Sequence, residues 1–425
     1  MRILITGADG FIGRHLVRHL LRCGHTVVGG VRQPARFQRW FPGLDWIVMD
    51  FAHDQRIEDW LLRLIGIDVV INTVGIFREQ GVQTFAAVHI RAPQALFRAC
   101  AQRGVVKVIQ ISALGADREA RSGYHLSKKT ADDYLAGLPL DWVIVQPSLV
   151  YGAEGASALL FKTLAVLPVI PLPGKGAQPV QPVHIDDLVQ AIAALLRPGA
   201  LSRCRVPLVG PQSVSFREML ARLRIALGLS SLPFVPVPLP LLRLAARSSE
   251  WLPASLLTRE TLGMLMRGNQ GDPAMITRLL GRPPRPVAEF IEPDAAPAER
   301  RLARLRWLLP LLKLSIALVW VITGIISLGI YPVQESYTLL ARVGITGALA
   351  PVFLYGAALL DIALGLAILL IRRGRWLWWG QMALIGSYSL IITWKLPEFW
   401  LHPFGPLLKN LPLLVALLLI AELED

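Results

Sequence analysis

The chain has 425 residues, of which 53% are hydrophobic, a length that allows two or three domains and an apolar share that excludes an ordinary soluble enzyme. Part of the chain is therefore expected to face lipid. A formal net charge of +14 can indicate binding to nucleic acid, but the sequence has no run of basic residues interleaved with aromatic residues. We therefore expect no nucleic-acid partner, and we expect the basic residues to face an anionic membrane leaflet.

The first residues predict a β-strand and a glycine-rich turn. Residues 1–5, MRILI, are too short for a signal sequence and lack a cleavage site, so they are better interpreted as a buried strand. The turn TGADGFIG follows, and glycines suit a sharp bend, a close approach to a ligand and tight packing of a helix on a strand. Its candidate cofactor-binding residues are Gly7, Gly10, Phe11, Ile12 and Gly13.

A helix is expected directly after this turn. The stretch RHLVRHLLRCG at residues 14–24 has helical periodicity, and Gly24 is expected to end the helix. A phosphate would then meet exposed N–H groups at the helix N-terminus, although three glycines alone also fit a plain tight turn. The expected apolar face consists of Leu16, Val17, Leu20 and Leu21.

The second predicted strand, TVVGGV, indicates which dinucleotide the chain prefers. Folds that bind NAD commonly carry an acid near the end of this strand, but no Asp or Glu occurs between Asp9 and Asp45. The strand runs into Arg32, whose guanidinium suits a 2′-phosphate, and Arg36 and Arg39 follow. NADP(H) is therefore expected as the preferred cofactor, and NAD(H) remains possible. The alternative interpretation of the three arginines is a solvated basic loop.

Strand-like and helix-like stretches then alternate, which is typical of a parallel sheet with crossover helices. Ligands of such sheets bind beyond the carboxyl ends of the strands. Asp50, at one such end, is expected to accept from the adenine amino group, and the loop from Asn72 to Gly75 is expected to pass along the ribose. Either feature also fits a simple turn at a strand end.

A Ser, a Tyr and a Lys form the strongest candidate for catalysis. Tyr124 and Lys128 are four residues apart, so they project from one face of a helix, and Ser112 lies at the end of a strand. We expect the ammonium group to lower the pKa of the phenol, so that Tyr124 exchanges a proton while the Ser112 hydroxyl polarises the substrate oxygen. The alternative is a pair of surface residues on an amphipathic helix.

These motifs, in this order, resemble the extended and atypical branch of the short-chain dehydrogenase/reductase superfamily. That branch includes NAD-dependent epimerase/dehydratases and the NADPH-binding accessory subunit of respiratory complex I. The resemblance covers about residues 1–295 and rests on the glycine turn, Ser112, Tyr124 and Lys128, VQPSLVYG at residues 145–152 and VHIDDLVQAI at residues 183–192. It implies pyrophosphate binding by Gly7, Gly10 and Gly13, 2′-phosphate binding by Arg32, an active-site set of Ser112, Tyr124 and Lys128, and a bond from Lys128 to the nicotinamide ribose.

Two features point away from catalysis. Gln146 stands where many extended members have Arg before the Pro of that strand. The complex I relative also shows that this fold can hold NADPH structurally, so the fold does not settle the function.

Residues 151–295 are expected to close over a substrate. A strand is expected to enter a helix that Asp186 helps to cap, and His184 is expected to be structural rather than a base. The apolar, proline-rich stretch LPFVPVPLPLLRLAARSSEWLP at residues 232–253 fits a hydrophobic substrate pocket, a membrane surface or ordinary packing. The cysteines lack the spacing of metal ligands, so we expect neither a disulfide framework nor a metal site; they are Cys23, Cys100 and Cys204.

A domain boundary is expected at residues 281–307, where five prolines preclude a continuous helix and indicate a linker. Apolar runs at residues 314–330, 347–371 and 376–394 predict membrane spans. A fourth run around residues 406–421 is shorter and is expected to cross, with a re-entrant segment as the alternative.

Charge placement predicts the orientation of these spans. Seven basic residues fall on one side and three on the other, so the positive-inside rule puts the dinucleotide domain in the cytoplasm, at the inner membrane of the cell. The seven are Arg300, Arg301, Arg304, Arg306, Arg372, Arg373 and Arg375, and the three are Arg342, Lys395 and Lys409.

Residues 305–425 resemble the DoxX-like membrane family, through DIALG at residues 361–365 and PFGPLLKNLPLL at residues 403–414. Some relatives of that family belong to quinone-linked redox systems. An acid within a bilayer is costly, so Asp361 is expected to hydrogen-bond a neighbouring span, the alternative being a proton or quinone role. The expected partners are Gln381, Tyr388 and Lys313.

The sequence thus predicts an α/β fold, a doubly wound parallel Rossmann sheet with a small substrate-binding region, followed by a four-helix transmembrane bundle. The expected divisions are residues 1–150 (NAD(P)-binding), 151–295 (substrate-binding), 296–306 (basic linker) and 307–425 (DoxX-like). The expected function is a membrane-anchored, NADP(H)-preferring oxidoreductase that acts on a small carbonyl or alcohol, with a hydrophobic substrate among the options. The alternatives are a non-catalytic NADPH-binding module that assembles or senses redox state in a membrane complex, and an epimerase/dehydratase with a recycled cofactor.

Overall fold

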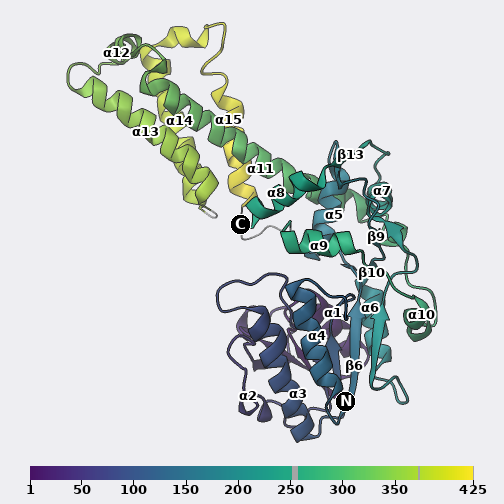
Figure 1. Cartoon of the computed structure of the whole chain (residues 1–425). Coiled ribbons are helices and arrows are strands. Elements are labelled where there is room, and N and C mark those ends of the chain that lie inside the picture. Colours follow the sequence, from purple (N-terminus) through teal and green to yellow (C-terminus); the bar gives the residue numbers. More distant parts are fainter. Residues whose placement is uncertain (251–256, 372–373, 425) are drawn as a thin grey trace. The chain divides into compact units, whose positions relative to one another are not determined.

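The computed structural model describes residues 1–250, 257–371 and 374–424 (Figure 1). The chain divides into two compact units, Met1–Ala303 and Arg304–Asp425, each with its own hydrophobic core. Residues 296–306, which were expected to form a linker, are helical and make up the first part of α11 (Ala296–Ile325). Pro297 lies in the first turn of α11, where a missing N–H costs no hydrogen bond.

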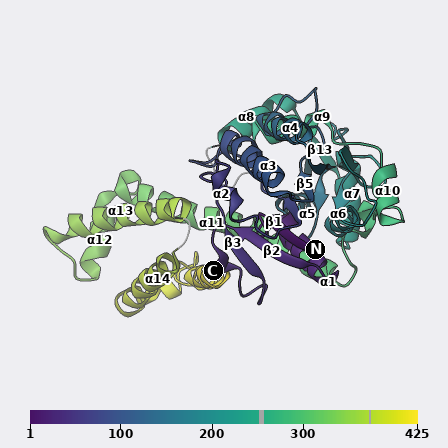
Figure 2. The same ribbon diagram turned by 90° about the horizontal axis from the view of Figure 1, so that it is seen from below.

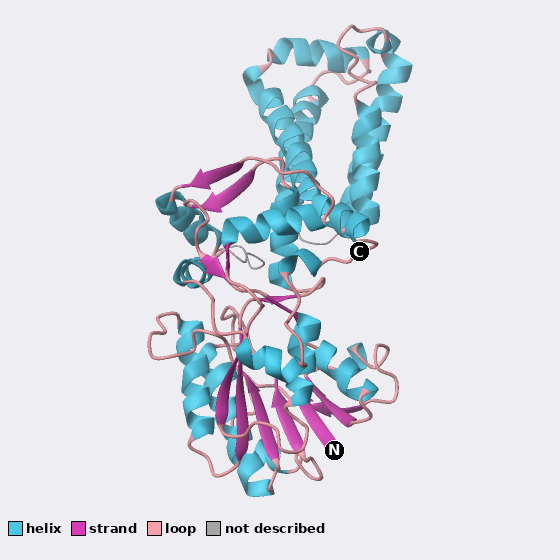
Figure 3. Cartoon of the chain, turned by 90° about the vertical axis from the view of Figure 1, so that its right-hand side faces the viewer, coloured by secondary structure: helices cyan, strands magenta, loops and turns pink. Residues whose placement is uncertain are grey.

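The central sheet of the first unit is parallel, as predicted, and it has seven strands (Figure 3, magenta). Their order is β3-β2-β1-β4-β5-β6-β11, and it reverses beside β1, which pairs with β2 on one side and with β4 on the other. The carboxyl ends of β1 and β4 therefore meet at a topological switch point, where such sheets bind ligands. The strands are β1 (Arg2–Thr6), β2 (Thr26–Val31), β3 (Asp45–Val48), β4 (Val69–Asn72), β5 (Lys107–Ile111), β6 (Asp141–Pro147) and β11 (Cys204–Leu208).

Helices cover both faces of this sheet (Figure 2). One face packs against α1 (Phe11–Arg22), α6 (Ile185–Ala194) and α10 (Ala274–Leu280). The other face packs against α2 (Glu58–Leu61), α3 (Ala92–Arg103) and α4 (Gly123–Ala136). A π-helical segment, Ala86–Arg91, leads into α3, and a 3₁₀ turn, Pro34–Arg36, follows β2.

The apolar face of α1 is narrower than predicted. Leu16, Val17 and Leu20 are buried, but Leu21 is 42% exposed. Successive residues are rotated by about 100° around the helix axis, so Leu20 lies at the centre of the buried face and Leu21 lies at its edge. The helix ends at Arg22, and Gly24 follows with a φ of +80°.

Residues 150–303 complete the first unit with short elements. Three two-stranded sheets pair β10 with β7, β12 with β9 and β13 with β8. The expectation that Asp186 caps α6 is wrong. The N-cap is His184, whose side chain accepts from the Asp186 N–H at 3.3 Å. The elements are β7 (Val150–Tyr151), α5 (Ala156–Val166), β8 (Ile170–Pro173), β9 (Pro179–Val180), β10 (Val183–His184), β12 (Val214–Ser215), α7 (Phe216–Ala226), β13 (Phe234–Val237), α8 (Leu239–Ser249), α9 (Arg259–Arg267) and the 3₁₀ turn Val287–Glu289.

The second unit is helical. Among the described residues, two helical segments, 296–330 and 349–370, are long and apolar enough to cross a membrane. The third and fourth predicted spans coincide with α14 (Arg375–Lys395) and the 14-residue α15 (Asn410–Leu423), and a bundle of four spans stays a prediction. The remaining elements are the π-helical Ile326–Ile330, α12 (Val333–Arg342), α13 (Leu349–Leu370) and the 3₁₀ turn Pro397–Trp400. Some residues used in the predictions above lie outside the described residues: residues 251–253, Arg372, Arg373 and Asp425.

Candidate functional site

The turn between β1 and α1 requires glycine at two positions, one for its backbone conformation and one for lack of space. Gly7 has a φ of +69°, which favours glycine, and its N–H donates to the Gly30 carbonyl at 2.9 Å. A Cβ on Gly13 would lie 2.1 Å from the Gly7 carbonyl oxygen. Helix α1 therefore approaches the turn this closely only because residue 13 has no side chain.

The N-terminus of α1 presents backbone N–H groups at the carboxyl edge of β1. Gly10 is the N-cap, no side chain caps the helix, and the first turn holds no acidic residue. The N–H groups of Phe11, Ile12 and Gly13 therefore lack the intrahelical partners that later residues have. This arrangement fits the pyrophosphate of a dinucleotide.

Arg32 directly follows β2 and is exposed, as are Arg36 and Arg39. Arg36 approaches the Gln33 side chain at 3.5 Å. Within the described part of the chain, the side chains of Arg32 and Arg39 have no hydrogen bond or ion pair. The guanidinium of Arg32 is therefore available to an anionic ligand.

Asp50 and Asn72 lie at the predicted strand ends, but their side chains already make protein contacts. The Asp50 carboxylate accepts from the Ala52 N–H at 3.0 Å and contacts His53 at 3.0 Å and Gln83 at 3.3 Å. Burial raises the pKa of this carboxyl, but these hydrogen bonds outweigh it and the pKa is lowered. Asp50 is thus ionised with part of its accepting capacity in use.

Asn72 is fully buried and joins three strands. Its Oδ1 accepts from the Thr6 hydroxyl at 2.6 Å, and its Nδ2 donates to Gln110 Oε1 at 2.7 Å. The side chain therefore fixes the ends of β1, β4 and β5 relative to one another. Only the backbone of the loop after Asn72 remains for the ribose contact that the sequence predicts.

Lys128 lies at the carboxyl ends of β4 and β5. Its Nζ donates to the carbonyls of Val74 at 3.2 Å and Ile111 at 3.1 Å. A Cβ on Gly75 would lie 3.1 Å from this Nζ, so Gly75 keeps the space beside the ammonium open. Burial lowers the pKa of Lys128, an effect that the carboxyl of Asp132 opposes.

Tyr124 lies one turn before Lys128 on α4, in an aromatic cluster. Its ring stacks on Phe77 with centroids 5.2 Å apart and meets Phe85, His89 and His125 edge to face. Burial raises the pKa of its phenol, and the carboxyls of Asp132 and Glu260 add to this. The expectation that Lys128 lowers this pKa is therefore wrong, because the ammonium is directed to backbone carbonyls in a site that desolvates both groups.

Ser112 is buried at the end of β5, and its hydroxyl donates to Asp132 Oδ2. The other oxygen of Asp132, Oδ1, is buried and has no hydrogen-bond partner among the described residues. Burial raises the pKa of this carboxyl, although the Ser112 hydroxyl and the Lys128 charge oppose the shift. The Ser112 side chain is thus turned toward Asp132, and no hydrogen bond joins it to Tyr124 among the described residues.

His89 supports Tyr124 from the π-helical segment before α3. Its Nε2 accepts from the Ile76 N–H at 2.9 Å, and its Nδ1 contacts the Ser127 hydroxyl at 2.8 Å. Ser127 in turn donates to the Tyr124 carbonyl at 2.8 Å. Burial, together with the charge of Lys128, lowers the pKa of His89 to about 2, so the imidazole is neutral and carries its proton on Nδ1.

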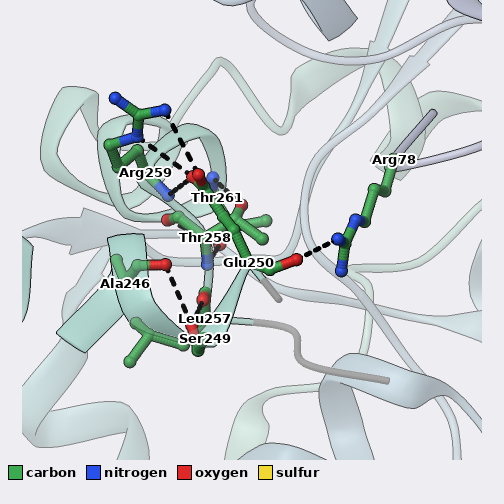
Figure 4. A network of polar contacts seen from close by, with 8 residues as sticks. All are labelled: Arg78, Ala246, Ser249, Glu250, Leu257, Thr258, Arg259 and Thr261. Atoms are coloured by element: carbon green, nitrogen blue, oxygen red, sulfur yellow. Dashed lines mark hydrogen bonds and ion pairs between the residues drawn. The ribbon is translucent and has the colours of Figure 1, made fainter. Parts of the chain in front are cut away.

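Two segments beyond the sheet contact Tyr124 or the loop beside it, and Figure 4 shows the polar contacts of the second. Glu260 of α9 accepts from the Tyr124 N–H at 2.7 Å. Arg78, next to Phe77, donates to the carbonyl of Glu250 at the end of α8, and the Glu250 carboxylate pairs with Arg259 at 3.1 Å. Hydrogen bonds and an ion pair therefore connect the C-terminal end of α8 and the N-terminal end of α9 to the loop whose Phe77 stacks on Tyr124.

The sequence could have indicated some of these contacts. Asp132 lies four residues after Lys128, on the same face of α4, so helical spacing places it near the ammonium. His89, Phe77 and Glu260 carry no such signal, because they come from separate loops and helices. The remaining candidate, Gln146, reaches the Ala116 carbonyl at 3.5 Å.

Two cavities lie away from this site. One of about 480 Å³ is at the amino ends of the strands, beside Met1, Cys23 and His25, and one of about 470 Å³ lies beside Gln181 and Gln270. Neither touches the glycine turn or Tyr124, so neither is the ligand site that the strand ends define.

Asp361 of α13 does not contact the predicted partners through hydrogen bonds. Gln381 accepts from the Trp320 indole N–H at 2.7 Å, and Lys313 pairs with Glu424. Asp361 Oδ1 is buried without a hydrogen-bond partner among the described residues. The acid is therefore unpaired within this part of the second unit.

The sheet order, the glycine turn and the α4 residues define the first unit as a dinucleotide-binding α/β domain of the Rossmann type. Residues 3–203 match the NAD dependent epimerase/dehydratase family, and residues 317–418 match the DoxX-like family. The chain thus joins an NAD(P)-dependent epimerase/dehydratase-like oxidoreductase fold to a DoxX-like membrane domain, as the sequence motifs predict.

Curated relatives match the first unit. Ceramide reductase of Caulobacter vibrioides is 28% identical over 209 residues, which are 49% of this chain and 62% of that protein. NADH dehydrogenase [ubiquinone] 1 alpha subcomplex subunit 9 of Rattus norvegicus is 28% identical over 243 residues, 56% of this chain and 63% of that protein. An uncharacterized protein of Mycobacterium tuberculosis is 29% identical over 57% of this chain, but only 25% of its own length is covered. The chain spans less than two thirds of the length of these relatives.

Solved structures share the fold. A nucleoside-diphosphate-sugar epimerase of Staphylococcus aureus superposes with a TM-score of 0.57 at 19% identity, covering 68% of this chain and 99% of that one. An NADPH-dependent quinone oxidoreductase of Escherichia coli in complex with NADPH has a TM-score of 0.55 at 19% identity, covering 68% and 97%. At such identities the likeness concerns the fold and leaves the reaction open.

Proposed function

We propose that this chain is a membrane-anchored, NADP(H)-preferring oxidoreductase that reduces a carbonyl compound or oxidises the corresponding alcohol. The observation that carries the proposal is the position of Tyr124 and Lys128, one helical turn apart on α4, at the carboxyl ends of β4 and β5 beside the glycine turn. In this assignment residues 1–150 bind the cofactor and residues 151–295 bind the substrate.

The residues present fit a dinucleotide. The turn needs glycine at Gly7 and Gly13, and the first turn of α1 offers N–H groups without a competing acid. Gly7, Gly10, Phe11, Ile12 and Gly13 would hold the pyrophosphate, Arg32 the 2′-phosphate and Asp50 the adenine. The backbone of the loop from Asn72 to Gly75, together with Lys128, would hold the riboses. When bound, the nicotinamide supplies or accepts hydride.

The side chains of α4 would transfer the proton that accompanies the hydride. The raised pKa of Tyr124 keeps its phenol protonated, so it is suited to donate a proton to the oxygen of a carbonyl substrate. Lys128 would place positive charge beside that oxygen and bind the ribose. Ser112 would reach the substrate only after its hydroxyl leaves Asp132.

A non-catalytic NADPH-binding module is the second candidate. The contact of Ser112 with Asp132 favours it, because the hydroxyl expected to polarise the substrate is already used within the protein. The similarity to a subunit of NADH dehydrogenase also favours it. An epimerase or dehydratase that recycles its cofactor is the third candidate, since the family of residues 3–203 bears that description.

The test is NADPH consumption by the full-length chain with apolar ketones, quinones and nucleotide sugars. Net consumption with a ketone or quinone supports the proposal. Conversion of a nucleotide sugar without net consumption would support the epimerase instead. Tight NADPH binding with no conversion of any of the three classes would favour the module.

Arg32 should set the choice of dinucleotide. Because its guanidinium is exposed and unpaired in the described structure, NADPH should bind the full-length chain at least about tenfold more tightly than NADH, a difference of roughly 1.4 kcal/mol. Arg32→Asp should narrow or reverse this difference in a calorimetric titration. Equal affinities in the unmodified chain would disprove the preference.

The membrane domain is proposed to have four spans, with the first unit in the cytoplasm, where NADPH is present. The seven basic residues near one set of span ends support this orientation. A cysteine at Thr338, in α12, should then react with an impermeant thiol reagent in intact cells, whereas one at Gly374 should not. The reverse labelling would place the first unit outside.

A further inference from the structure

An apolar surface is exposed on the first unit around α8. Leu241 is 58% exposed, Leu244 62% and Val235, on β13, 44%. Within α8, Ala246 is the buried residue. We name these three exposed residues, together with Arg243 and Arg247, the α8 face. Large apolar side chains exposed together on neighbouring elements of a folded domain are typical of an interaction site.

The charges on this face have one sign. No Asp or Glu occurs between Glu218 and Glu250, while Arg243 and Arg247 are exposed on α8. Helical spacing places Leu241 and Leu244 on one side of α8, opposite the buried Ala246, with Arg247 three residues after Leu244 on the same side and Arg243 at its margin. Exposed leucines beside arginines on an amphipathic helix fit the surface of an anionic bilayer.

The chain itself brings that surface within reach. The apolar segment at residues 296–330 follows in the same chain, so the first unit is tethered to the membrane that its second unit enters. A tether turns docking into an intramolecular step, so a helix with a few apolar residues is enough to stay bound. An acidic protein partner would satisfy the arginines but would not have this fixed proximity.

The α8 face is also joined to the cover of Tyr124. Helix α8 ends at Ser249, and Arg78 donates to the carbonyl of the next residue, Glu250 (Figure 4). Phe77, next to Arg78, stacks on Tyr124 and is 62% exposed. A helix docked on lipid would therefore be hydrogen-bonded, through Glu250, to the loop whose Phe77 stacks on the proposed catalytic tyrosine.

We infer that the α8 face docks on the anionic surface of the bilayer and that the substrate is a lipid-soluble carbonyl compound that reaches Tyr124 from that bilayer. The second part rests on the proposed oxidoreductase function. The first part stands without it.

Docking is tested with the full-length chain in nanodiscs of phosphatidylcholine with phosphatidylglycerol. A bimane probe on Leu244→Cys, with Cys23 and Cys204 replaced by Ser, should be quenched by spin-labelled lipid several-fold more than the same probe on Leu62→Cys, a 75% exposed leucine after α2. Pure phosphatidylcholine, or Arg243→Gln with Arg247→Gln, should reduce this quenching. Equal quenching at both positions would overturn docking. A probe at position 244 that is shielded from water but not quenched by lipid would also overturn docking, and would indicate that a second copy of the chain covers α8.

The substrate class is tested with Leu241→Glu/Leu244→Glu against the matched control Leu62→Glu/Ile65→Glu, two exposed apolar residues elsewhere on the unit. The first variant should lower NADPH-dependent turnover of a long-chain ketone in the nanodisc by about tenfold or more, and leave a short, water-soluble ketone unchanged. Equal losses for both ketones would overturn the bilayer route. If the unmodified chain consumes NADPH with neither the ketones nor the quinones of the panel above, the proposed function fails, while the quenching result still decides docking.

Discussion

Tyr124→Phe is expected to lower turnover by about a hundredfold to ten-thousandfold, the usual worth of a general acid. The substitution removes the hydroxyl but keeps the ring that stacks on Phe77, and no hydrogen bond of that hydroxyl is lost within the described residues. NADPH affinity and thermal stability should therefore hardly change. The measurement is NADPH consumption with a substrate found in the panel above, together with a binding titration.

Lys128→Ala serves as the contrasting variant. Its Nζ bonds to the carbonyls of Val74 and Ile111 and lies beside Gly75, so its loss should weaken both turnover and NADPH binding. A structural module would show another pattern, in which Lys128→Ala impairs binding and Tyr124→Phe has no consequence. Full complementation of a deletion strain by Tyr124→Phe would rule out the enzyme.

Gly13→Ala is expected to disable the dinucleotide site and weaken the fold. The new Cβ would lie 2.1 Å from the Gly7 carbonyl oxygen and 2.9 Å from Ala8 Cα, both of which are backbone atoms. Helix α1 must then shift, which should cost about 1–3 kcal/mol of stability, as overpacking does elsewhere. Since the shift moves the N–H groups proposed to bind the pyrophosphate, NADPH affinity should fall by more than about tenfold. Thermal unfolding and a titration measure the two effects.

Gly263→Ala is the matched control, because Gly263 lies inside α9 with no atom within 4 Å of the position of a Cβ. Alanine is favoured over glycine within a helix by about 0.5–1 kcal/mol, so stability should hold or rise. If Gly13→Ala behaves like this control, the turn tolerates a side chain and the proposed phosphate contacts are wrong.

The candidate site was predictable where a local pattern defines it. The glycine turn, the strand before it and the helix after it occur within the first residues of the chain, so their spacing alone places N–H groups at a strand end. Tyr124 and Lys128 are likewise one helical turn apart, and α4 keeps them on one side.

The surroundings of these residues were not predictable, and they changed the chemistry. The spacing suggests that Lys128 acts on the phenol of Tyr124, but the pKa of the phenol depends on burial and on Glu260, which is 136 residues away in the sequence. Similarly, Ser112 lies where predicted, while its partner is decided by which way its side chain leaves β5.

The sequence by itself determined the parallel sheet, the glycine turn, the Tyr and Lys pair and the apolar character of the second unit, because each depends on periodicity or short spacing. Only the tertiary structure decided that Asn72 joins three strands, that His89 is neutral beneath Tyr124, and that α8 leaves Leu241 and Leu244 exposed. The physical reason is that burial and hydrogen bonding between distant segments depend on how the segments pack, which no local pattern of residues records.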